Sequence, residues 1–248
     1  MKEREIYAGL RTVAPLFVRV DGRNFRRVLA LLKCERPYDL TFAKSMSAAA
    51  EMLMRDSGLP VRLIFTFSDE INALFCEAPF RGRVEKLDSI VASFIASALT
   101  LKLSLSSPLA FDARIVPVRA SGIPFYLAWR QSEAWRNHVN AYGYYSLRKS
   151  GYRAREAHAK LRGMGSSEIH ELVYAHGINL AKTPSWQRRG ILIHKELCEK
   201  QGYNVKTGQA TTAQRMKVVQ KWDVPLFASP EGTELIVKLM DEDTNKYQ

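Results

Sequence analysis

Short runs rich in β-branched and aromatic residues, each bounded by turn residues, recur through the first half of the chain. They predict four strands, at residues 15–20, 61–67, 71–76 and 114–118. Between them, apolar residues recur at helical spacing over Leu40–Ser57 and Val84–Leu105, which predicts two amphipathic helices. The predicted order β-α-β-β-α-β is the split βαβ unit, which we expect to fold as an antiparallel sheet with helices on one face.

The pattern changes beyond Pro124. Helical spacing predicts three further helices, at residues 126–150, 153–162 and 166–174, and the apolar run at 190–194 is a candidate strand in a hairpin. Residues 201–216 are polar and weakly patterned. We therefore expect an α+β fold in two parts: a sheet domain over residues 1–124 and a helical and hairpin extension over 125–248 that packs on it.

The composition is that of a globular protein, with 46% hydrophobic and 25% charged residues. The charge is less ordinary, because 37 Lys and Arg against 25 Asp and Glu give a net charge of +12. Between Arg130 and Lys195 there are twelve basic and four acidic residues, so two thirds of the surplus lies in that stretch. This concentration indicates a polyanionic partner, nucleic acid first. A membrane surface is the alternative, although no Lys/Arg-rich amphipathic helix stands out.

Three scattered cysteines, Cys34, Cys76 and Cys198, form no CxxC pair, which argues against a disulfide framework and a zinc ribbon. The N-terminal segment is charged and holds no apolar signal core. No run of about 18 apolar residues occurs, the length that a membrane-spanning helix needs. We therefore expect a reduced, cytoplasmic protein that does not enter a membrane.

Several familiar catalytic motifs are missing from the sequence: the Walker P-loop, the G-x-S-x-G elbow and the H-E-x-x-H zinc pair. What remains is a pair of carboxylates. Asp21 ends the first predicted strand, and Asp69 lies in the turn between the second and third. We expect the two strands after the crossover helix to be central and adjacent, so that the end of the first strand and the turn between those two come to one edge of the sheet, with both carboxylates.

Two carboxylates at such an edge suit Mg²⁺, which takes one or two protein carboxylates together with substrate phosphates. Paired ions activate an attacking hydroxyl and neutralise a leaving pyrophosphate, which is the chemistry of the palm in nucleotide polymerases and cyclases. Gly22 has no side chain, so its carbonyl can approach a metal and its amide a phosphate. Alternatively, the Asp-Gly and Ser-Asp-Glu stretches are ordinary turns without chemistry.

A series of short motifs runs in order from about Val18 to Ile193. They are Val20-Asp21-Gly22-Arg23-Asn24-Phe25, Arg36-Pro37-Tyr38-Asp39, Phe67-Ser68-Asp69-Glu70, Phe111-Asp112-Ala113-Arg114, Trp129-Arg130-Gln131, Gly177-Ile178-Asn179 and Arg188-Arg189-Gly190. Together they resemble the tRNA-His guanylyltransferase family, the 3′–5′ nucleotide-adding polymerases that extend the 5′ end of tRNA. The resemblance implies a polymerase-like palm over residues 1–124, a tRNA-contacting extension over 125–248, and a dimer or tetramer.

The resemblance also implies a role for each matching residue. Asp21 and Asp69 would be the catalytic residues and the ligands of two Mg²⁺ ions, with the Gly22 carbonyl as a third ligand. The nucleotides GTP and ATP would contact these residues together with Arg23, Asn24, Phe25, Arg26, Arg36, Asp39 and Ser68. Phosphates and tRNA would be bound by Arg81, Arg83, Lys86, Arg130, Arg136, Asn137, Arg188 and Arg189.

The implied reaction begins with activation of a tRNA 5′-monophosphate by ATP, which releases pyrophosphate. The 3′-hydroxyl of an incoming NTP, normally GTP, then attacks the activated 5′ phosphate and releases AMP. Removal of pyrophosphate from the new 5′ end completes the cycle, and a 5′-triphosphate tRNA can skip the activation.

One departure from the family pattern bears on nucleotide choice. Eukaryotic members carry a His-Ile-Asn-Asn motif where this chain has Trp135-Arg136-Asn137-His138. The departure favours the guanylyltransferase-like branch, in which nucleotides are added by pairing with a template and truncated tRNA 5′ ends are repaired. A basic residue that the family has before a late Asn-Glu-Ile motif is also missing from Glu168-Ile169-His170-Glu171.

Two other functions stay open. A palm-type nucleotide cyclase would share the carboxylates but would not need the basic stretch between Arg130 and Lys195. A non-catalytic RNA-binding module of the same topology would stack bases on sheet aromatics, but the sequence holds no [RK]-G-[FY]-[GA]-F-V-x-[FY] string.

Overall fold

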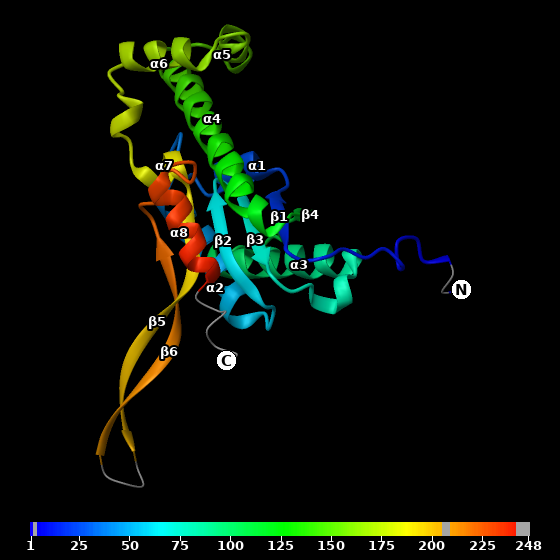
Figure 1. Ribbon diagram of the computed structural model, residues 1–248. Helices are drawn as coiled ribbons and strands as arrows, with labels where there is room; N and C mark the ends of the chain where they lie inside the picture. Colours follow the sequence, from blue (N-terminus) through cyan, green and yellow to red (C-terminus); the bar gives the residue numbers. More distant parts are fainter. Residues whose placement is uncertain (2–3, 205–208, 242–248) are drawn as a thin grey trace.

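A six-stranded antiparallel sheet forms the centre of the computed structural model, which describes residues 1, 4–204 and 209–241 (Figure 1). The strands are β1 (Leu16–Gly22), β2 (Val61–Phe67), β3 (Glu70–Phe75), β4 (Phe111–Pro117), β5 (Ile191–Asn204) and β6 (Gln209–Lys221). Their order across the sheet is β4-β1-β3-β2-β5-β6. The two strands that follow the crossover helix, β2 and β3, are central neighbours as expected. β3 also pairs with β1, which brings the end of β1 to the β2–β3 turn.

Helices α2 (Leu40–Asp56) and α3 (Val84–Lys102) are the predicted crossover helices, and they cover one face of the sheet. Successive side chains of a strand point to opposite faces, so Leu16, Val18 and Val20 of β1 all meet these two helices. These residues belong to one buried cluster together with the apolar stripes of both helices. The helical spacing read from the sequence is thus explained by a single core.

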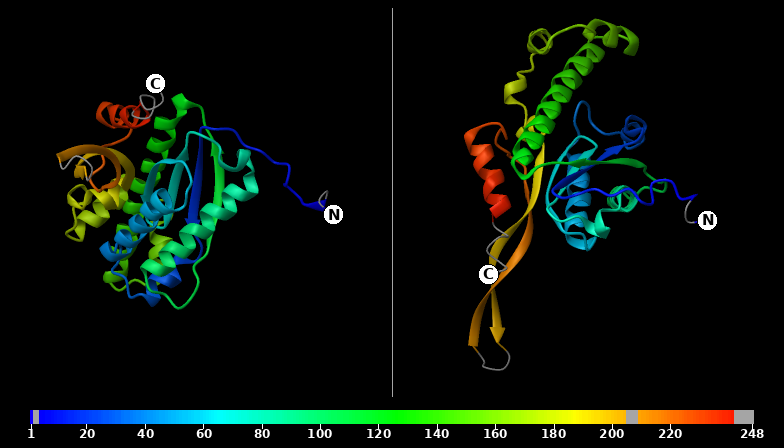
Figure 2. Two further views of the ribbon diagram at one scale, coloured as in Figure 1. Left: turned by 90° about the horizontal axis from the view of Figure 1, so that it is seen from below. Right: turned by 45° about the vertical axis from the view of Figure 1, so that its right-hand side comes forward.

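The opposite face of the sheet is also covered, by elements from outside the split βαβ unit (Figure 2). Phe17 of β1 points to this side, and its ring stacks on Tyr126 of α4 (Ile123–Lys149) with the centroids 4.0 Å apart. Phe227 and the helix α8 (Pro230–Asp241) complete this second core. The second layer comes from the C-terminal half of the chain, whose helices the split βαβ pattern does not include.

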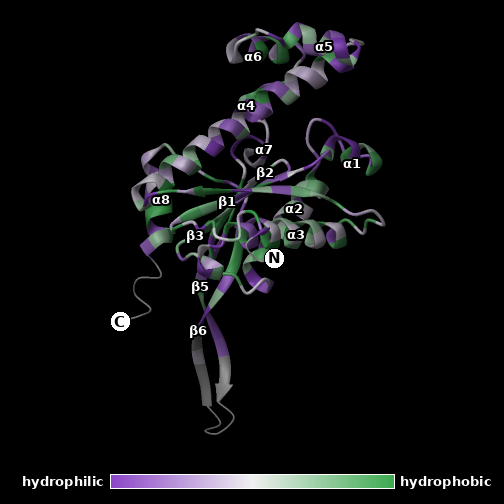
Figure 3. Ribbon diagram, turned by 90° about the vertical axis from the view of Figure 1, so that its right-hand side faces the viewer, coloured by the Kyte–Doolittle hydropathy of each residue, from purple (hydrophilic) through white to green (hydrophobic). Residues whose placement is uncertain are grey.

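The second half of α4 leaves the sheet and carries α5 (Ala154–Leu161) and α6 (Ser166–Ala175) at its far end (Figure 1). A small third core, which includes Ile169 and Val173, holds α6 against α4. Gly143 permits this approach, because a Cβ there would stand 2.6 Å from Ile169 Cγ2. In Figure 3 hydrophobic residues concentrate in the strands, whereas α5 is largely hydrophilic.

The β5–β6 hairpin extends beyond the body of the sheet (Figure 1). β5 pairs with β2 only from Ile191 to His194, and the rest of its length pairs with β6 alone. The C-terminal half therefore supplies two strands of the shared sheet, and a domain boundary at residue 124 stays a prediction.

Short elements complete the described chain. They are α1 (Phe25–Leu31), α7 (Ser185–Arg189) and the 3₁₀ turns η2 (Pro79–Gly82), η3 (Ala120–Gly122) and η4 (Leu180–Lys182). Within the described ranges, every helix is too short or too polar to cross a membrane.

Candidate active site

The structure brings Asp21, Gly22 and Asp69 together at one edge of the sheet, and we call this group the acidic edge. Asp21 and Gly22 end β1, and Asp69 lies in the turn between β2 and β3. The Gly22 N–H donates to the carbonyl oxygen of Asp69 at 3.2 Å. A Cβ at Gly22 would stand 2.4 Å from the Phe25 ring and 2.9 Å from Asp69 Oδ2, so glycine lets both side chains pack close to the backbone here.

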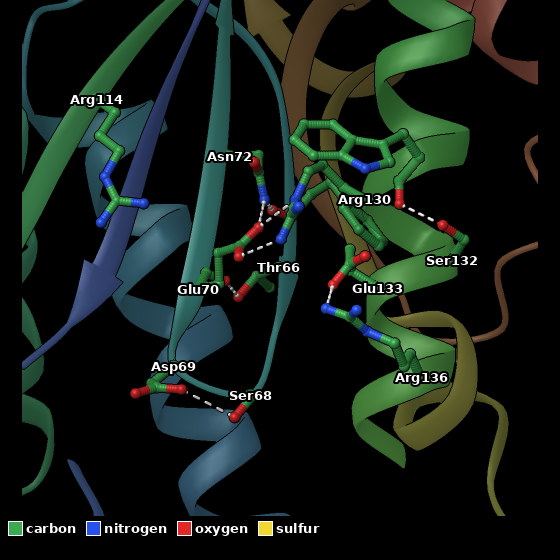
Figure 4. A network of polar contacts seen from close by, with 12 residues as sticks. Thr66, Ser68, Asp69, Glu70, Asn72, Arg114, Arg130, Ser132, Glu133 and Arg136 are labelled. Carbon is green, nitrogen blue, oxygen red and sulfur yellow. Dashed lines mark hydrogen bonds and ion pairs between the residues drawn. The ribbon is translucent and has the colours of Figure 1, made fainter. Parts of the chain in front are cut away.

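Both carboxyl groups of the acidic edge resist ionisation. Burial raises the pKa of Asp69 to about 6; the negative charge of Asp21 adds to this effect, and a hydrogen bond from Ser68 opposes it. That bond runs from Ser68 Oγ to Asp69 Oδ1 at 2.9 Å (Figure 4). The pKa of Asp21 is also raised, first by burial and then by the charges of Glu70 and Asp112 on the neighbouring strands. The edge therefore favours a cation or a proton.

The acidic edge offers few side-chain ligands. Among the described residues, no group of three or more His, Cys, Asp or Glu side chains is placed to hold a metal ion. A cation bound by the two carboxylates would complete its coordination with the Gly22 carbonyl, substrate oxygens and water. Such a set of hard oxygen ligands with few protein carboxylates fits Mg²⁺.

Glu70 follows Asp69 but is directed toward α4, where it is 8% exposed (Figure 4). Arg130 donates from Nε to Glu70 Oε1 at 2.8 Å and from Nη2 to Oε2 at 2.6 Å. Asn72 donates to the same Oε1 at 2.8 Å and accepts a hydrogen bond from Tyr126 at 2.7 Å. Arg130, expected on the tRNA surface, is only 6% exposed. Its pair with Glu70, the residue after Asp69, helps to hold the acidic edge in position.

A cavity of about 240 Å³ opens beside the acidic edge and gathers several of the expected nucleotide-binding residues. Its walls include Arg36 and Asp39 from the loop before α2, Ser68 from the β2–β3 turn, and Asn137 from α4. Trp186 of α7 adds an aromatic wall. A partly apolar cavity with a few polar groups is typical of a small-ligand site.

Two of the expected nucleotide contacts, Asp39 and Phe25, also stabilise the local fold of this region. Asp39 accepts the N–H of Glu35 at 2.9 Å and that of Phe42 at 2.7 Å, which caps α2. Its carboxylate is thus occupied by backbone donors. Phe25 is 3% exposed and packs against Phe42 and Phe111, so it anchors the chain that follows the acidic edge.

The remaining residues of the loop after Gly22 turn away from the 240 Å³ cavity. Arg23 and Asn24 are exposed and line a separate hollow of about 380 Å³ together with Arg27. Arg26 is exposed as well and lines a third cavity, of about 460 Å³. The structure therefore groups Arg36, Asp39, Ser68 and Asn137 around one cavity but not these three residues.

The segment that carries Arg81, Arg83 and Lys86 lies at the other end of the sheet. It follows the far end of β3, opposite the start of β1, whereas the acidic edge adjoins the start of β3. At about 3.3 Å per residue, the length of β3 separates the two by roughly 20 Å. Arg81 and Arg83 line a hollow of about 390 Å³ with Arg11. Within one chain, this segment does not reach the acidic edge.

The other residues expected to contact tRNA differ in their exposure and in the contacts that they already make within the chain. Arg136 is exposed on α4 and pairs with Glu133 of the same helix. Arg188 and Arg189 are half-buried, and each donates to a backbone carbonyl, at 2.9 and 3.2 Å respectively. These two guanidinium groups therefore help to fix α7 against its surroundings.

Two family models match consecutive parts of the chain. The model described as tRNAHis guanylyltransferase matches residues 1–119, and the model described as the Thg1 C terminal domain matches residues 122–227. The probable tRNA(His) guanylyltransferase of Drosophila melanogaster is 30% identical over 194 residues, which cover 73% of this chain and 68% of that protein. The tRNA(His) guanylyltransferase of Saccharomyces cerevisiae is 28% identical over 195 residues, which cover 73% and 82% of the two chains.

Solved structures share the fold. The crystal structure of the Saccharomyces cerevisiae tRNA(His) guanylyltransferase matches with a TM-score of 0.66 and 25% identity, over 77% of this chain and 90% of that chain. A bacterial Thg1-like protein in complex with GTP matches with a TM-score of 0.70 and 21% identity, over 96% of both chains. The expected mixture of helices with an antiparallel sheet is confirmed. With two family models in tandem and relatives of 28–30% identity, the chain belongs to the tRNA(His) guanylyltransferase family.

Proposed function

We propose that this protein adds nucleotides, mainly G, to the 5′ end of tRNA in the 3′–5′ direction, as directed by a template strand. Membership of the tRNA(His) guanylyltransferase family supports an activity in nucleotide addition to tRNA. The observation that carries the proposal is the acidic edge, where two carboxylates flank Gly22 beside a cavity of about 240 Å³. Residues 1–124 would act as the palm, and residues 125–248 as the tRNA-contacting extension.

Asp21 and Asp69 are the residues that would hold Mg²⁺, two ions per site, with the Gly22 carbonyl as a further ligand. Burial and neighbouring carboxylates raise the pKa of both carboxyls, and a bound cation offsets that negative charge. When bound, magnesium lowers the pKa of the attacking hydroxyl and offsets charge on the transferring phosphoryl group.

The chain's own residues position the nucleotide. Tyr38 and Trp186 supply aromatic surface in the 240 Å³ cavity, on which a base can stack. Arg36 lines the same cavity and offers its guanidinium to a phosphate. GTP and ATP are the substrates we propose, and a bacterial Thg1-like protein of the same fold has been solved with each of them.

Trp135 is the reason to propose a template. It occupies the position of the first His in the eukaryotic motif, and its ring lies 5.5 Å from the rings of His138 and His170. It is outside the lining of the 240 Å³ cavity, which Asn137 reaches. Nucleotide choice would then come from pairing with the opposite strand. Such an enzyme suits repair of tRNA 5′ ends as well as tRNA-His maturation, and we propose a cytoplasmic homo-oligomer, a dimer or a tetramer.

The experiment that tests this proposal combines the protein with Mg²⁺, ATP, labelled GTP and a tRNA that lacks its first 5′ nucleotide. We expect a labelled tRNA extended by one nucleotide, with ATP required for a 5′-monophosphate substrate and dispensable for a 5′-triphosphate one. A parallel reaction with GTP alone tests for a cyclase. Cyclic product in the absence of RNA, or failure to extend any truncated tRNA, would overturn the proposal.

A further inference from the structure

A second cavity, of about 460 Å³, adjoins the 240 Å³ cavity. The two share Arg36 and Pro37 as a common wall. The other residues that line the second cavity come from α1, from the second half of α4 and from the segment after α6: Arg26, Tyr142, Tyr144, Tyr145, Ser146, Arg148, Lys149 and Ile178. We call it the tyrosine cavity.

The tyrosine cavity combines positive charge with aromatic surface. Four of its residues are cationic, namely Arg26, Arg36, Arg148 and Lys149, and acidic side chains are absent from its described lining. None of the four forms an ion pair with another described residue. By contrast, the 240 Å³ cavity carries two carboxylates. Uncompensated cations beside aromatic rings suit a ligand that has both a phosphate and a planar base.

The rings at the cavity wall are arranged for such a ligand. The rings of Tyr144 and Tyr145 meet edge to face with centroids 5.0 Å apart, and both residues are half-buried. The Arg36 guanidinium lies 5.8 Å from the Tyr145 ring. An aromatic pair with a guanidinium group beside one ring can hold a planar base.

We infer that the tyrosine cavity binds an unpaired nucleotide of the RNA 3′ strand, the one directly beyond the template position. The inference rests on the proposed function. An enzyme that extends a 5′ end on a template needs a partner strand that overhangs at its 3′ side. An unpaired nucleotide therefore lies next to the pair that is being formed, and the shared wall places the tyrosine cavity next to the site of the incoming nucleotide.

The surface beside the tyrosine cavity favours a polynucleotide over a free nucleotide. Exposed basic residues continue from the cavity along the end of α4 and through α5: Arg148, Lys149, Arg153, Arg155, Lys160 and Arg162. The acidic residue in this stretch, Glu156, already accepts a hydrogen bond from the backbone N–H of Arg153 at 2.7 Å. A basic track of this length exceeds the phosphates of one nucleotide and matches a strand.

The test compares two labelled acceptor-stem RNA duplexes, one blunt and one with a short 3′ overhang, by fluorescence anisotropy. Tyr145→Leu keeps an apolar side chain but removes the ring. We expect it to weaken binding of the overhang duplex about tenfold, the size of one lost base stack, and to leave the blunt duplex almost unchanged. Lys102→Ala, which removes an exposed cation at the end of α3, is the matched control.

Arg148→Ala is the second variant, because Arg148 is exposed and its loss does not disturb a core. For the overhang duplex, it should reduce the slope of log affinity against log salt concentration by about one unit, the contribution of one phosphate contact. Equal losses for blunt and overhang duplexes in both variants would overturn the inference. The inference would also be overturned if the variants lost affinity for free GTP but not for either duplex, because the cavity would then bind a free nucleotide. A wild-type protein that neither binds RNA nor extends tRNA would instead refute the proposed function.

Discussion

Arg130 and Glu70 form a bidentate ion pair inside the core, with Nε 2.8 Å from Oε1 and Nη2 2.6 Å from Oε2. Their side chains are 8% and 10% exposed, so the pair is shielded from water. Glu70 is the first residue of β3 and the chain neighbour of Asp69. The pair therefore ties α4 to the strand that begins directly after the acidic edge, and we regard Arg130 as a positioning residue.

Replacing Arg130 with Met should destabilise the protein by about 3–5 kcal/mol, because Glu70 would be left buried without its counter-charge. Combining Arg130→Met with Glu70→Gln should recover much of this loss, since no uncompensated charge then remains. Urea unfolding of the wild type, both single variants and the double variant measures the coupling between the two residues. Simply additive losses would contradict a coupled pair.

Changing Asp21 or Asp69 to Asn should slow nucleotide addition by about 10²-fold or more, as the loss of a single electrostatic contact at a reacting centre does. RNA affinity should change little, because it comes mainly from Lys and Arg contacts to phosphate. Single-turnover rates and RNA binding are measured for both variants. Asp56→Asn, at the exposed end of α2, is the control. Near-normal rates in either active-site variant would refute the assignment of these carboxylates.

Stability should depend on pH through His138, which is fully buried. Burial lowers its pKa from 6.5 to about 4, and the charge of Arg188 adds to this effect. The unfolded chain therefore binds a proton at a higher pH than the folded one, so the stability due to this group is present above pH 6.5 and is lost as pH falls toward 4.

His138→Gln, which cannot ionise, should make the protein less sensitive to acid than the wild type. Urea unfolding at pH 7 and pH 5 compares the loss of stability between the two proteins. The wild type should lose more over this interval, because part of its loss comes from protonation of His138 in the unfolded chain. Equal losses would mean that His138 does not contribute.

Nucleotide choice should follow the template base, because Trp135 cannot offer guanine the polar contact of a histidine. The measurement uses 5′-truncated tRNAs that differ only in the templating base, with each NTP supplied singly. We expect G opposite C to be added about 10²-fold faster than G opposite A, since a mispair displaces the attacking 3′-hydroxyl by about 1 Å. Other nucleotides should be added opposite their complements. Equal addition of G opposite A and C would show that the enzyme reads guanine itself.

The core elements were predictable because each buries a face. Val61–Phe67 is the clearest case, since the predicted and observed strands have the same bounds. The helix α8 escaped prediction although its signals are present. Ser229 caps it through a hydrogen bond from the Gly232 N–H at 3.2 Å, and Pro230 opens its first turn.

The candidate site was predictable only where local patterns define it. Asp21 and Asp69 each adjoin a strand end, so the predicted topology of the sheet was enough to bring them to the same edge. The Arg130–Glu70 pair joins residues 60 positions apart, and its geometry depends on how α4 lies on the sheet. The 240 Å³ cavity is built from a loop, a turn and parts of α4 and α7. Neither feature has a local signature, because each depends on tertiary packing.

β5 is one continuous strand that takes part first in the central sheet and then in the extended hairpin. From Ile191 to His194 it is bonded to β2, and beyond that point to β6 alone. The direction of the hairpin is therefore set by the sheet, and a one-residue insertion in β5 would turn every later side chain to the other side. As homologous proteins diverge, an insertion inside the paired strands keeps the two faces of the hairpin only if it adds two residues to a strand, whereas lengthening beyond the last pair leaves the earlier side chains on their faces.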